Sequence, residues 1–520
     1  MANYPGEGTG ASFPASVALS VQYDAETKRY TLVRPGFSSS FGERELDSQA
    51  SNAAFTAYRL ANATAIDMLR LTKPGTSGAF NYEYVGGGIW RTLDTAGGVE
   101  QHRFAAFTYG MPSPDADVPL TGSASFAIGL VANAATSQGM LDIYGTGLLK
   151  VDFAERRFTI EGATSNRDLP SPGSTLPGFL RIGRFEGNGL VASGSNAMIG
   201  TVNLQATNRY TTSLTGAFFG PGLAEIGATI VGIGSYSAHG LVGSILGRKG
   251  DVAPEFETMA NLMAPLSLTE LSRQVLYREE RPGVYSQASL DHQTWSSMSI
   301  DPAAGTFRFG LAHLTPATRL ANQADPRFTA YQTSGATNHE AKVYRAGAGN
   351  PELDLSYTSF AIDNVAVAGD GRRWIDASLF GMQTYGPNVP TSGRGVFEGR
   401  VHGGAVGAGA SADRFSVEGS AGLDVDFAKS TFTGSMTPFV TNLRTGEISQ
   451  LGAYTFQNGT LSPMALALNA EIGGPPGASG AMHGSFFGPF AQEVGATFGL
   501  ITPGAGTVLT ATGVIVGKRR

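Results

Sequence analysis

The chain of 520 residues contains no cysteine. This absence excludes disulfide bonds, thiolate metal sites and cysteine nucleophiles. It is compatible with an extracellular protein, because a large β-rich protein of a bacterial envelope can be stabilised by burial alone. Charged residues are also few, at 15% of the chain against about 25% in an ordinary soluble domain. The net charge of −6 excludes a broadly basic surface for nucleic acid.

Features of a membrane-targeting or membrane-crossing segment are lacking too. Residues 1–5 have neither the charged start nor the apolar stretch of a signal peptide, so we expect either a mature N-terminus or a protein that is not exported. The long uncharged stretch 494–517 is interrupted by Pro503 and by several Gly and Thr, which is unlike a membrane helix. It predicts two strands joined by a turn at 503–506.

The residues that are abundant indicate β-structure. Glycine accounts for 71 of the 520 residues, and the 42% of hydrophobic residues are sufficient for a buried interior. Apolar and polar residues alternate in segments such as 149–153, which is the period of a strand with one buried face. Turn signals separate such segments at 24–27, 188–189, 301–305, 369–371, 444–446 and 458–459. Many strands with tight turns predict an all-β protein of antiparallel sandwiches or barrels.

An internal repeat divides the chain into two halves. Residues 216–229 read Gly-Ala-Phe-Phe-Gly-Pro and continue to Glu-Ile-Gly-Ala-Thr, and residues 484–497 have the same spacing with nearly the same residues. Upstream, Val-Asp-Phe-Ala occurs at 151–154 and again at 425–428. We therefore predict a duplication with one lobe in each half.

The repeat also predicts a difference between the two halves. We align Tyr109 with Tyr385, each followed by Gly and later by Pro. From Tyr to Pro the first half has ten steps (119 − 109) and the second has five (390 − 385). This alignment predicts a longer surface loop at Met111–Val118, because loops tolerate insertions.

One segment between the halves departs from the strand pattern. Ser267 and Glu270 have capping-box spacing, and Leu268, Leu271, Val275 and Leu276 follow at near-helical intervals. We predict about three turns of helix here, in the connector between the lobes.

The duplicated motif resembles the barrel signature of the transferrin-binding protein B family. The matching residues are Gly216, Phe218, Gly220, Pro221, Glu225 and Gly227 in the first half, and Gly484, Phe486, Gly488, Pro489, Glu493 and Gly495 in the second. The resemblance implies two tandem lobes, each a β-rich handle domain followed by an antiparallel eight-stranded β-barrel. It gives an N-lobe handle at 1–104, an N-lobe barrel at 105–248, a connector at 249–284, a C-lobe handle at 285–377 and a C-lobe barrel at 378–520.

The twin glutamates of the motif allow two interpretations. Glu225 and Glu493 could bind a ligand, or each could accept hydrogen bonds at the turn between two barrel strands and hold the Gly-Pro corner. Their identical placement in both lobes favours the structural role, because duplicated scaffolds keep structural contacts while sites diverge. The binding candidates are instead loop residues of the N-lobe: Tyr109, Met111, Pro112, Ser113, Pro114 and Asp115.

Signatures of catalysis and of cofactor binding are not found in the sequence. The histidines are scattered, without the spacing of a zinc site: His102, His239, His292, His313, His339, His402 and His483. The glycine-rich stretch 403–410 is not followed by a helix pattern, and no Gly-x-Ser-x-Gly elbow occurs. We expect no metal, no cofactor and no enzyme activity. Tyr109, Tyr210, Tyr236 and Tyr385 lie near turns, where tyrosines are either core residues or part of a recognition surface.

Two functions remain from these observations. The resemblance implies a lipid-anchored receptor on the outer membrane or surface of a bacterium, although the family's lipid-attachment cysteine is missing from this sequence. Such a receptor would capture a host protein, a metal carrier or a small nutrient for a TonB-dependent outer-membrane transporter. The alternative is a structural surface protein, either an adhesin or a self-assembling array subunit, which the low charge favours because repulsion between copies is weak.

Overall fold

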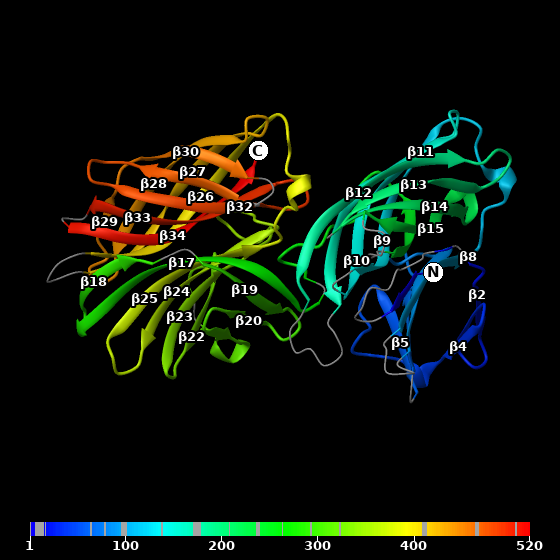
Figure 1. Ribbon diagram of the computed structural model, residues 1–520, viewed down its shortest axis with the longest axis horizontal. Coiled ribbons are helices and arrows are strands. Elements are labelled where there is room, and N and C mark those ends of the chain that lie inside the picture. Colours follow the sequence, from blue (N-terminus) through cyan, green and yellow to red (C-terminus); the bar gives the residue numbers. More distant parts are fainter. Residues whose placement is uncertain are drawn as a thin grey trace. The chain divides into compact units, whose positions relative to one another are not determined.

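The computed structural model describes residues 2–5, 15, 17–62, 65–76, 80–94, 101–136, 139–169, 178–206, 208–235, 240–262, 264–291, 294–321, 324–407, 413–462, 467–504 and 507–520. Within these ranges every regular element is a β-strand or a single 3-10 turn (Figure 1). The chain divides into two compact units: an N-lobe of residues 1–173 and 183–256, and a C-lobe of residues 257–520 with 174–182. The prediction of an all-β, two-lobed protein is confirmed. No helix in the described part of the chain could span a lipid bilayer.

The handle of the N-lobe consists of two sheets. A five-stranded sheet has the order β1-β8-β7-β6-β5, and a three-stranded sheet has the order β2-β3-β4. Buried Leu32 and Phe41 of the smaller sheet pack against Trp90 and Phe107 of the larger one. The strands are β1 (Ala2–Pro5), β2 (Ser20–Asp24), β3 (Arg29–Arg34), β4 (Phe37–Phe41), β5 (Phe55–Ala61), β6 (Ala65–Thr72), β7 (Val85–Asp94) and β8 (Gln101–Gly110), with a 3-10 turn η1 (Glu43–Glu45).

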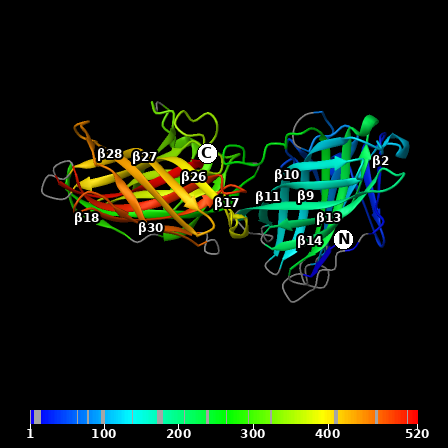
Figure 2. The ribbon, with the colours of Figure 1, turned by 90° about the horizontal axis from the view of Figure 1, so that it is seen from above.

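The barrel of the N-lobe is closed by eight antiparallel strands, in the order β10-β11-β12-β13-β14-β15-β16-β9. Figure 2 shows these strands wrapping obliquely round the wall. Alternate side chains point inward, and they fill the interior with a continuous cluster of apolar residues that includes Phe126, Phe158 and Phe218. The elements are η3 (Asp115–Asp117), β9 (Ser123–Thr136), β10 (Gly139–Asp152), β11 (Arg157–Leu169), β12 (Leu180–Val191), β13 (Ala197–Gln205), β14 (Arg209–Phe219), η4 (Pro221–Leu223), β15 (Glu225–Gly234) and β16 (Gly240–Lys249).

The handle of the C-lobe is one sheet of nine strands, in the order β21-β20-β19-β17-β25-β24-β23-β22, with β18 also paired to β17. The strands are β17 (Leu266–Arg281), β18 (Val284–Leu290), β19 (Thr294–Asp301), β20 (Thr306–Phe309), β21 (Ala312–Leu314), β22 (Phe328–Thr333), β23 (Thr337–Tyr344), β24 (Thr358–Val367) and β25 (Arg372–Gly381), with a 3-10 turn η5 (Pro316–Thr318).

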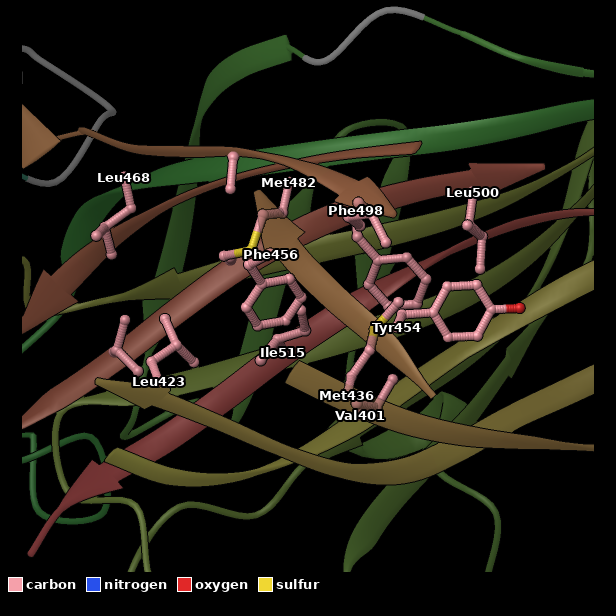
Figure 3. Packing of buried hydrophobic residues seen from close by; sticks show 14 of the residues in the cluster. Val401, Leu423, Met436, Tyr454, Phe456, Leu468, Met482, Phe498, Leu500 and Ile515 are labelled. Atoms are coloured by element: carbon pink, nitrogen blue, oxygen red, sulfur yellow. The ribbon is translucent and has the colours of Figure 1, made fainter. Parts of the chain in front are cut away.

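The barrel of the C-lobe repeats the architecture of the first. Its sheet runs β27-β26-β34-β33-β32-β31-β30-β28, and pairing of β28 with β27 closes the ring, while short β29 adds to β28. Met436, Phe456, Met482 and Phe498 converge in the interior (Figure 3). The elements are η6 (Gly386–Asn388), β26 (Arg394–Gly407), β27 (Arg414–Asp426), β28 (Thr431–Asn442), β29 (Ile448–Gln450), β30 (Tyr454–Ser462), β31 (Ala467–Gly473), β32 (Ser479–Phe487), β33 (Glu493–Gly504) and β34 (Thr507–Arg519).

The prediction of a helix in the connector is wrong, because these residues form β17 in the middle of the C-lobe handle. Leu271 and Val275 belong to the apolar clusters that β17 shares with β25 and with the barrel. Leu268 and Glu270, on the opposite face of the strand, are buried as well. Because both faces are buried, apolar and polar residues do not alternate strictly along β17. Glu270 does not cap a helix but accepts hydrogen bonds from Ser296 Oγ (2.8 Å) and Ser378 Oγ (2.6 Å) on flanking strands.

The strand pairings also shift three of the expected boundaries. The boundary at 104 falls inside β8, and the boundary at 377 falls inside β25, and both of these strands belong to handle sheets. Residues 266–281 of the expected connector 249–284 are the handle strand β17. The expected turn at 503–506 includes residues 505 and 506, which lie outside the described residues.

Candidate functional site

The duplicated motif lies where each barrel meets its handle. In the N-lobe it leads from β14 through Gly220 into β15, and in the C-lobe from β32 through Gly488 into β33. Both glycines have a positive φ, 74° and 88°. A Cβ atom at Gly220 would lie 2.5 Å from the ring of Tyr84, and one at Gly488 would lie 2.6 Å from the ring of Tyr357. Only glycine therefore fits both the backbone angle and the close approach of the handle.

Glu225 joins the N-lobe barrel to its handle. It is the first residue of β15 and only 3% exposed. Its carboxylate accepts hydrogen bonds from the backbone N–H groups of Glu83 (2.8 Å), Tyr84 (2.7 Å) and Val85 (2.9 Å), at the start of β7. Charge-assisted bonds of this kind are stronger than those between neutral groups. One side chain thus supplies the acceptors for three consecutive N–H groups of the handle.

Glu493 makes the same contacts in the C-lobe. It is fully buried and accepts from the N–H groups of Ser356 (2.5 Å), Tyr357 (3.0 Å) and Thr358 (3.0 Å). Burial raises the pKa of Glu493 to about 7, although the three donors and Lys518 act in the opposite direction. We expected the donors at the Gly-Pro corner between two barrel strands. They lie instead in the handle, more than a hundred residues earlier in the chain.

The loop that follows β8 has the same length as its counterpart, so the prediction of a longer N-lobe loop is wrong. Met111 N–H donates to the Tyr84 carbonyl (2.9 Å), and Met382 N–H donates to the Tyr357 carbonyl (2.8 Å). Ser113 Oγ donates to the Gly220 carbonyl (2.5 Å), as Thr384 Oγ1 does to the Gly488 carbonyl (2.6 Å). These contacts align Met111 with Met382. The predicted alignment of Tyr109 with Tyr385 is out of register, because the Tyr-Gly pair recurs by coincidence.

The structure separates the loop candidates into exposed and buried residues. Met111 is 60% exposed, and Pro112, Pro114 and Asp115 also face solvent. Ser113 is buried, and its hydroxyl donates a hydrogen bond to the Gly220 carbonyl. Tyr109 is half-buried in the handle beside Phe107, and burial raises its pKa.

The other tyrosines near turns do not extend the exposed surface of this loop. Tyr210 is fully buried in the barrel interior and Tyr385 is half-buried. Tyr236 lies outside the described residues.

A second exposed feature adjoins this loop in the N-lobe. Asn196, in the turn between β12 and β13, ties the hairpin to the loop: its Nδ2 donates to the Ser113 carbonyl (2.6 Å) and its N–H to Asp115 Oδ1 (2.8 Å). On the same hairpin Leu190 and Ile199 face each other across the strands, 55% and 60% exposed. No pattern in the sequence marks this pair, since single apolar residues in a strand carry no signal of exposure.

The C-lobe has polar residues at the matching positions. In the N-lobe, Ile199 pairs with Thr215, the residue before the motif glycine. In the C-lobe, the residue before the motif glycine is His483, which pairs with Asn469, so Asn469 matches Ile199. Asn469 also pairs with Thr460, just as Ile199 pairs with Leu190, so Thr460 matches Leu190. At these two positions the exposed apolar pair therefore occurs in the N-lobe and not in the C-lobe.

The histidines with clear partners are held by structural contacts. His339 Nδ1 lies 2.7 Å from Asp363 Oδ2, and His402 Nε2 lies 2.8 Å from Glu352 Oε2. His483 Nδ1 lies 2.5 Å from Asn469 Oδ1, and burial lowers its pKa. His239 and His292 lie outside the described residues. Within the described ranges, no cluster of three or more His, Asp or Glu side chains could hold a metal ion.

A polar pocket of about 330 Å³ lies between the handle and the barrel of the C-lobe. Arg373 is paired with Glu279 (2.7 Å), and the Arg414 guanidinium lies 5.5 Å from the centre of the Tyr285 ring. The lining residues come from seven strands, so no spacing in the sequence marks them. The pocket could hold a small polar ligand through its amides, hydroxyls and guanidinium groups.

Comparison with known proteins gives matches only among solved structures. No family model matches the chain, and no curated protein matches its sequence. The chain is similar to the structure of an intact two-lobed TbpB designated Ap, with 12% identity over 86% of both chains and a TM-score of 0.29. It is similar to the isotype 1 transferrin binding protein B of serogroup B Neisseria meningitidis, with 15% identity over 85% of both chains and a TM-score of 0.29. For a double mutant of the Haemophilus parasuis Hp5 protein the identity is 13%, over 84% of this chain and 83% of that one, with a TM-score of 0.27.

Proposed function

We propose that this protein is a non-enzymatic binding protein of a bacterial cell surface, which recognises another protein through the exposed end of its N-lobe. The observation that carries the proposal is the packing of the barrels. Both interiors are filled by apolar side chains, whereas barrels that bind small ligands keep a cavity. Ligand binding is thus left to outer surfaces.

The recognition surface in this proposal consists of Met111, Leu120, Leu190 and Ile199, with the intervening loop. Leu120, at 84%, is the most exposed of the four. Asn196 links the loop to the hairpin that carries the other two residues. Exposed apolar side chains that gather in one place on a polar surface are typical of protein–protein contacts. Small-molecule sites are concave and bury most of the ligand, so exposed apolar side chains of this kind suit a host protein or a nutrient carrier better than a small molecule.

The resemblance of the twin motif to the transferrin-binding protein B family adds the biological setting. A surface receptor of this kind would pass its ligand to an outer-membrane transporter. Transferrin itself is one test ligand, and other carriers in serum are equally compatible with the recognition surface.

The experiment begins with the full chain immobilised and exposed to host serum, and with mass spectrometry of the retained proteins. Each retained protein is then purified and titrated against wild type, Met111→Asp and the double variant Leu190→Asp/Ile199→Asp. We expect affinity to fall at least about tenfold while the melting temperature stays unchanged, because exposed side chains contribute little to folding. The matched control is Val396→Asp, at an exposed valine on the C-lobe barrel.

Two results would contradict the proposal. If Val396→Asp abolishes binding and the N-lobe variants bind normally, the recognition surface is assigned to the wrong lobe. If no serum protein binds and the chain self-associates at micromolar concentration, the array-subunit alternative is correct.

A further inference from the structure

The polar pocket of the C-lobe lies where one face of the handle sheet changes from apolar to polar. Residues that pair across antiparallel strands share a face of the sheet. One such row crosses five strands and consists of Val275, Ile375, Asn364, Glu340 and Gln332. Its apolar end is covered by the barrel, because Val275 and Ile375 pack in one cluster with Val406. The three polar residues continue the same face and line the pocket.

Arg414, the first residue of barrel strand β27, lines the pocket from the barrel side. Burial lowers the pKa of Arg414, but Tyr277, Tyr285 and Glu340 together outweigh burial, and the net shift is upward. Glu340 is thus near enough to attract the guanidinium. Within the described part of the chain, however, Arg414 and Glu340 form no ion pair with each other or with any other side chain.

The other charged or titratable groups that line the pocket already have partners. Arg373 pairs with Glu279 at 2.7 Å. Both ring nitrogens of His339 contact side-chain oxygen atoms of other handle residues. The pocket therefore offers a ligand one cation, Arg414, and one anion, Glu340.

The N-lobe has the same architecture but a different lining on the handle side. The motif glutamates bind the starts of β7 and β24, so Arg91 of β7 matches Asn364 of β24. Their strand partners match in turn, with Met68 in the N-lobe and Glu340 in the C-lobe. The pocket that Met68 and Arg91 line has a volume of only about 100 Å³.

The barrel side of the pocket differs in a similar way. Met140 and Arg414 lie the same number of residues before the repeated Val-Asp-Phe-Ala, on strands that pair without a register shift. Met140 is buried in one cluster with Phe104 of the handle. The C-lobe thus has a charge in place of a methionine on each side, and its pocket of about 330 Å³ lies in the size range of small-ligand sites. An unpaired guanidinium at a half-buried position is unfavourable by itself, and a ligand that pairs with it removes this cost.

We propose that this pocket binds a free α-amino acid with an uncharged polar side chain. Arg414 pairs with the carboxylate of the amino acid and Glu340 with its ammonium group. The amides of Asn364 and Gln332, which have no side-chain partner among the described residues, form hydrogen bonds with its side chain. This proposal concerns the C-lobe and does not depend on the recognition surface of the N-lobe.

The test measures the melting temperature of the full chain with each of the common L-amino acids added in excess. A ligand that binds only the folded state raises the melting temperature. We expect this increase with one or more of glutamine, asparagine, serine and threonine, and calorimetric titration then gives the affinity. The α-amide of the amino acid that binds lacks the carboxylate, and its N-acetyl derivative lacks the ammonium group. Each should bind at least about tenfold more weakly, because one charge-assisted contact is lost.

Two variants place the N-lobe residue in the C-lobe pocket: Arg414→Met and Glu340→Met. Each should fold, since methionine occupies the matching position of the N-lobe, and each should weaken binding at least about tenfold. The matched controls Arg308→Met and Glu447→Met, at exposed sites of the C-lobe, should bind as wild type does. The proposal is overturned if no amino acid binds wild type, if only amino acids with charged or apolar side chains bind, or if the α-amide or the N-acetyl derivative binds equally well. Full-strength binding by either pocket variant overturns it too.

Discussion

Three backbone N–H groups at the start of a handle strand point at one carboxylate in each lobe, and that carboxylate belongs to the barrel. A carboxylate can accept several hydrogen bonds at once, whereas an amide has only one acceptor atom. Glu225 and Glu493 therefore each bind the start of a handle strand to the barrel of the same lobe.

We predict that Glu225→Gln and Glu493→Gln each lower stability by about 1–3 kcal/mol, because the new NH₂ group faces N–H donors that lose their acceptor. The effect should appear in the melting of the altered lobe only and should leave ligand binding intact. Glu161→Gln and Glu447→Gln, at exposed sites in the N-lobe and C-lobe, are the controls. A Glu225→Gln variant that melts like wild type but no longer binds ligand would assign this glutamate to the binding site.

Asp376 gives the C-lobe handle a dependence on pH. It is buried directly opposite Asp363 on the neighbouring strand, and burial, Glu270 and Asp363 raise its pKa from 3.8 to about 7. The folded state therefore keeps a proton that the unfolded chain releases near pH 4. The stability that this proton provides is complete at low pH and is lost as the pH rises through about 7.

We predict that Asp376→Asn removes much of this dependence, since Asn is neutral at every pH. The variant should melt somewhat above wild type at pH 5 and further above it at pH 8, because the loss in wild type begins near pH 4 and grows up to about pH 7. Thermal melting at the two pH values is the measurement, with Glu447→Gln at an exposed site in the C-lobe as the control. A larger loss of stability at pH 8 than at pH 5 would mean that the ionised form is the one that the fold requires.

Sequence reasoning could identify the motif glutamates but not their partners. The repeat singled out Glu225 because two copies with the same spacing are hard to explain by chance. Its donors lie about 140 residues away, on a strand that no local pattern connects to the motif. Contacts between elements that are distant in the chain depend on topology, which the local period of a strand does not specify.

At the scale of elements, the alternating pattern predicts strands that have one buried face. It fails for a strand such as β17, in which both faces are buried. The predicted hairpin turn at 24–27 joins β2 to β3. A local contact forms it: Asp24 Oδ1 accepts from the N–H groups of Glu26 (2.9 Å) and Thr27 (3.2 Å), so nearby residues alone indicate the turn. The pair Asn188-Gly189 was misread as a turn and lies inside β12. Gly189 is needed there because a Cβ atom would lie 2.5 Å from the ring of Phe158 in the barrel interior.

We predict that Gly189→Ala destabilises the N-lobe by about 1–3 kcal/mol, the usual cost of overpacking a filled core. Movement of the Phe158 ring alone would not relieve the contact, because the new Cβ would also lie 2.3 Å from the backbone carbonyl oxygen of Ile199 on the paired strand. Gly250→Ala, where the nearest atom is 3.6 Å from the new Cβ, is the control and should change stability little. If Gly189→Ala melts like this control, the close approach of Phe158 and of the Ile199 carbonyl does not explain why glycine occupies this position.

At the scale of the whole molecule, the duplication predicts that each half has a core of its own. The filled barrel of the C-lobe satisfies this condition, but the boundary of the folding unit differs from the one that the sequence suggests. Strand β17 begins at Leu266, before the expected handle, and lies between β19 and β25 in the same sheet. A fragment that starts at residue 285 would leave both of these neighbours without their common partner.

We predict that residues 257–520 fold alone and melt cooperatively, whereas residues 285–520 are less stable or aggregate. Without β17, the apolar residues that pack against Leu271 and Val275 face water, and β25 becomes an open edge that can pair with other chains. Thermal melting and size-exclusion chromatography of the two fragments measure the difference. Addition of a peptide of residues 264–284 should restore part of the stability of 285–520 and should leave 257–520 unchanged. Equal melting temperatures for the two fragments would show that β17 is dispensable and that the C-lobe core lies entirely after residue 285.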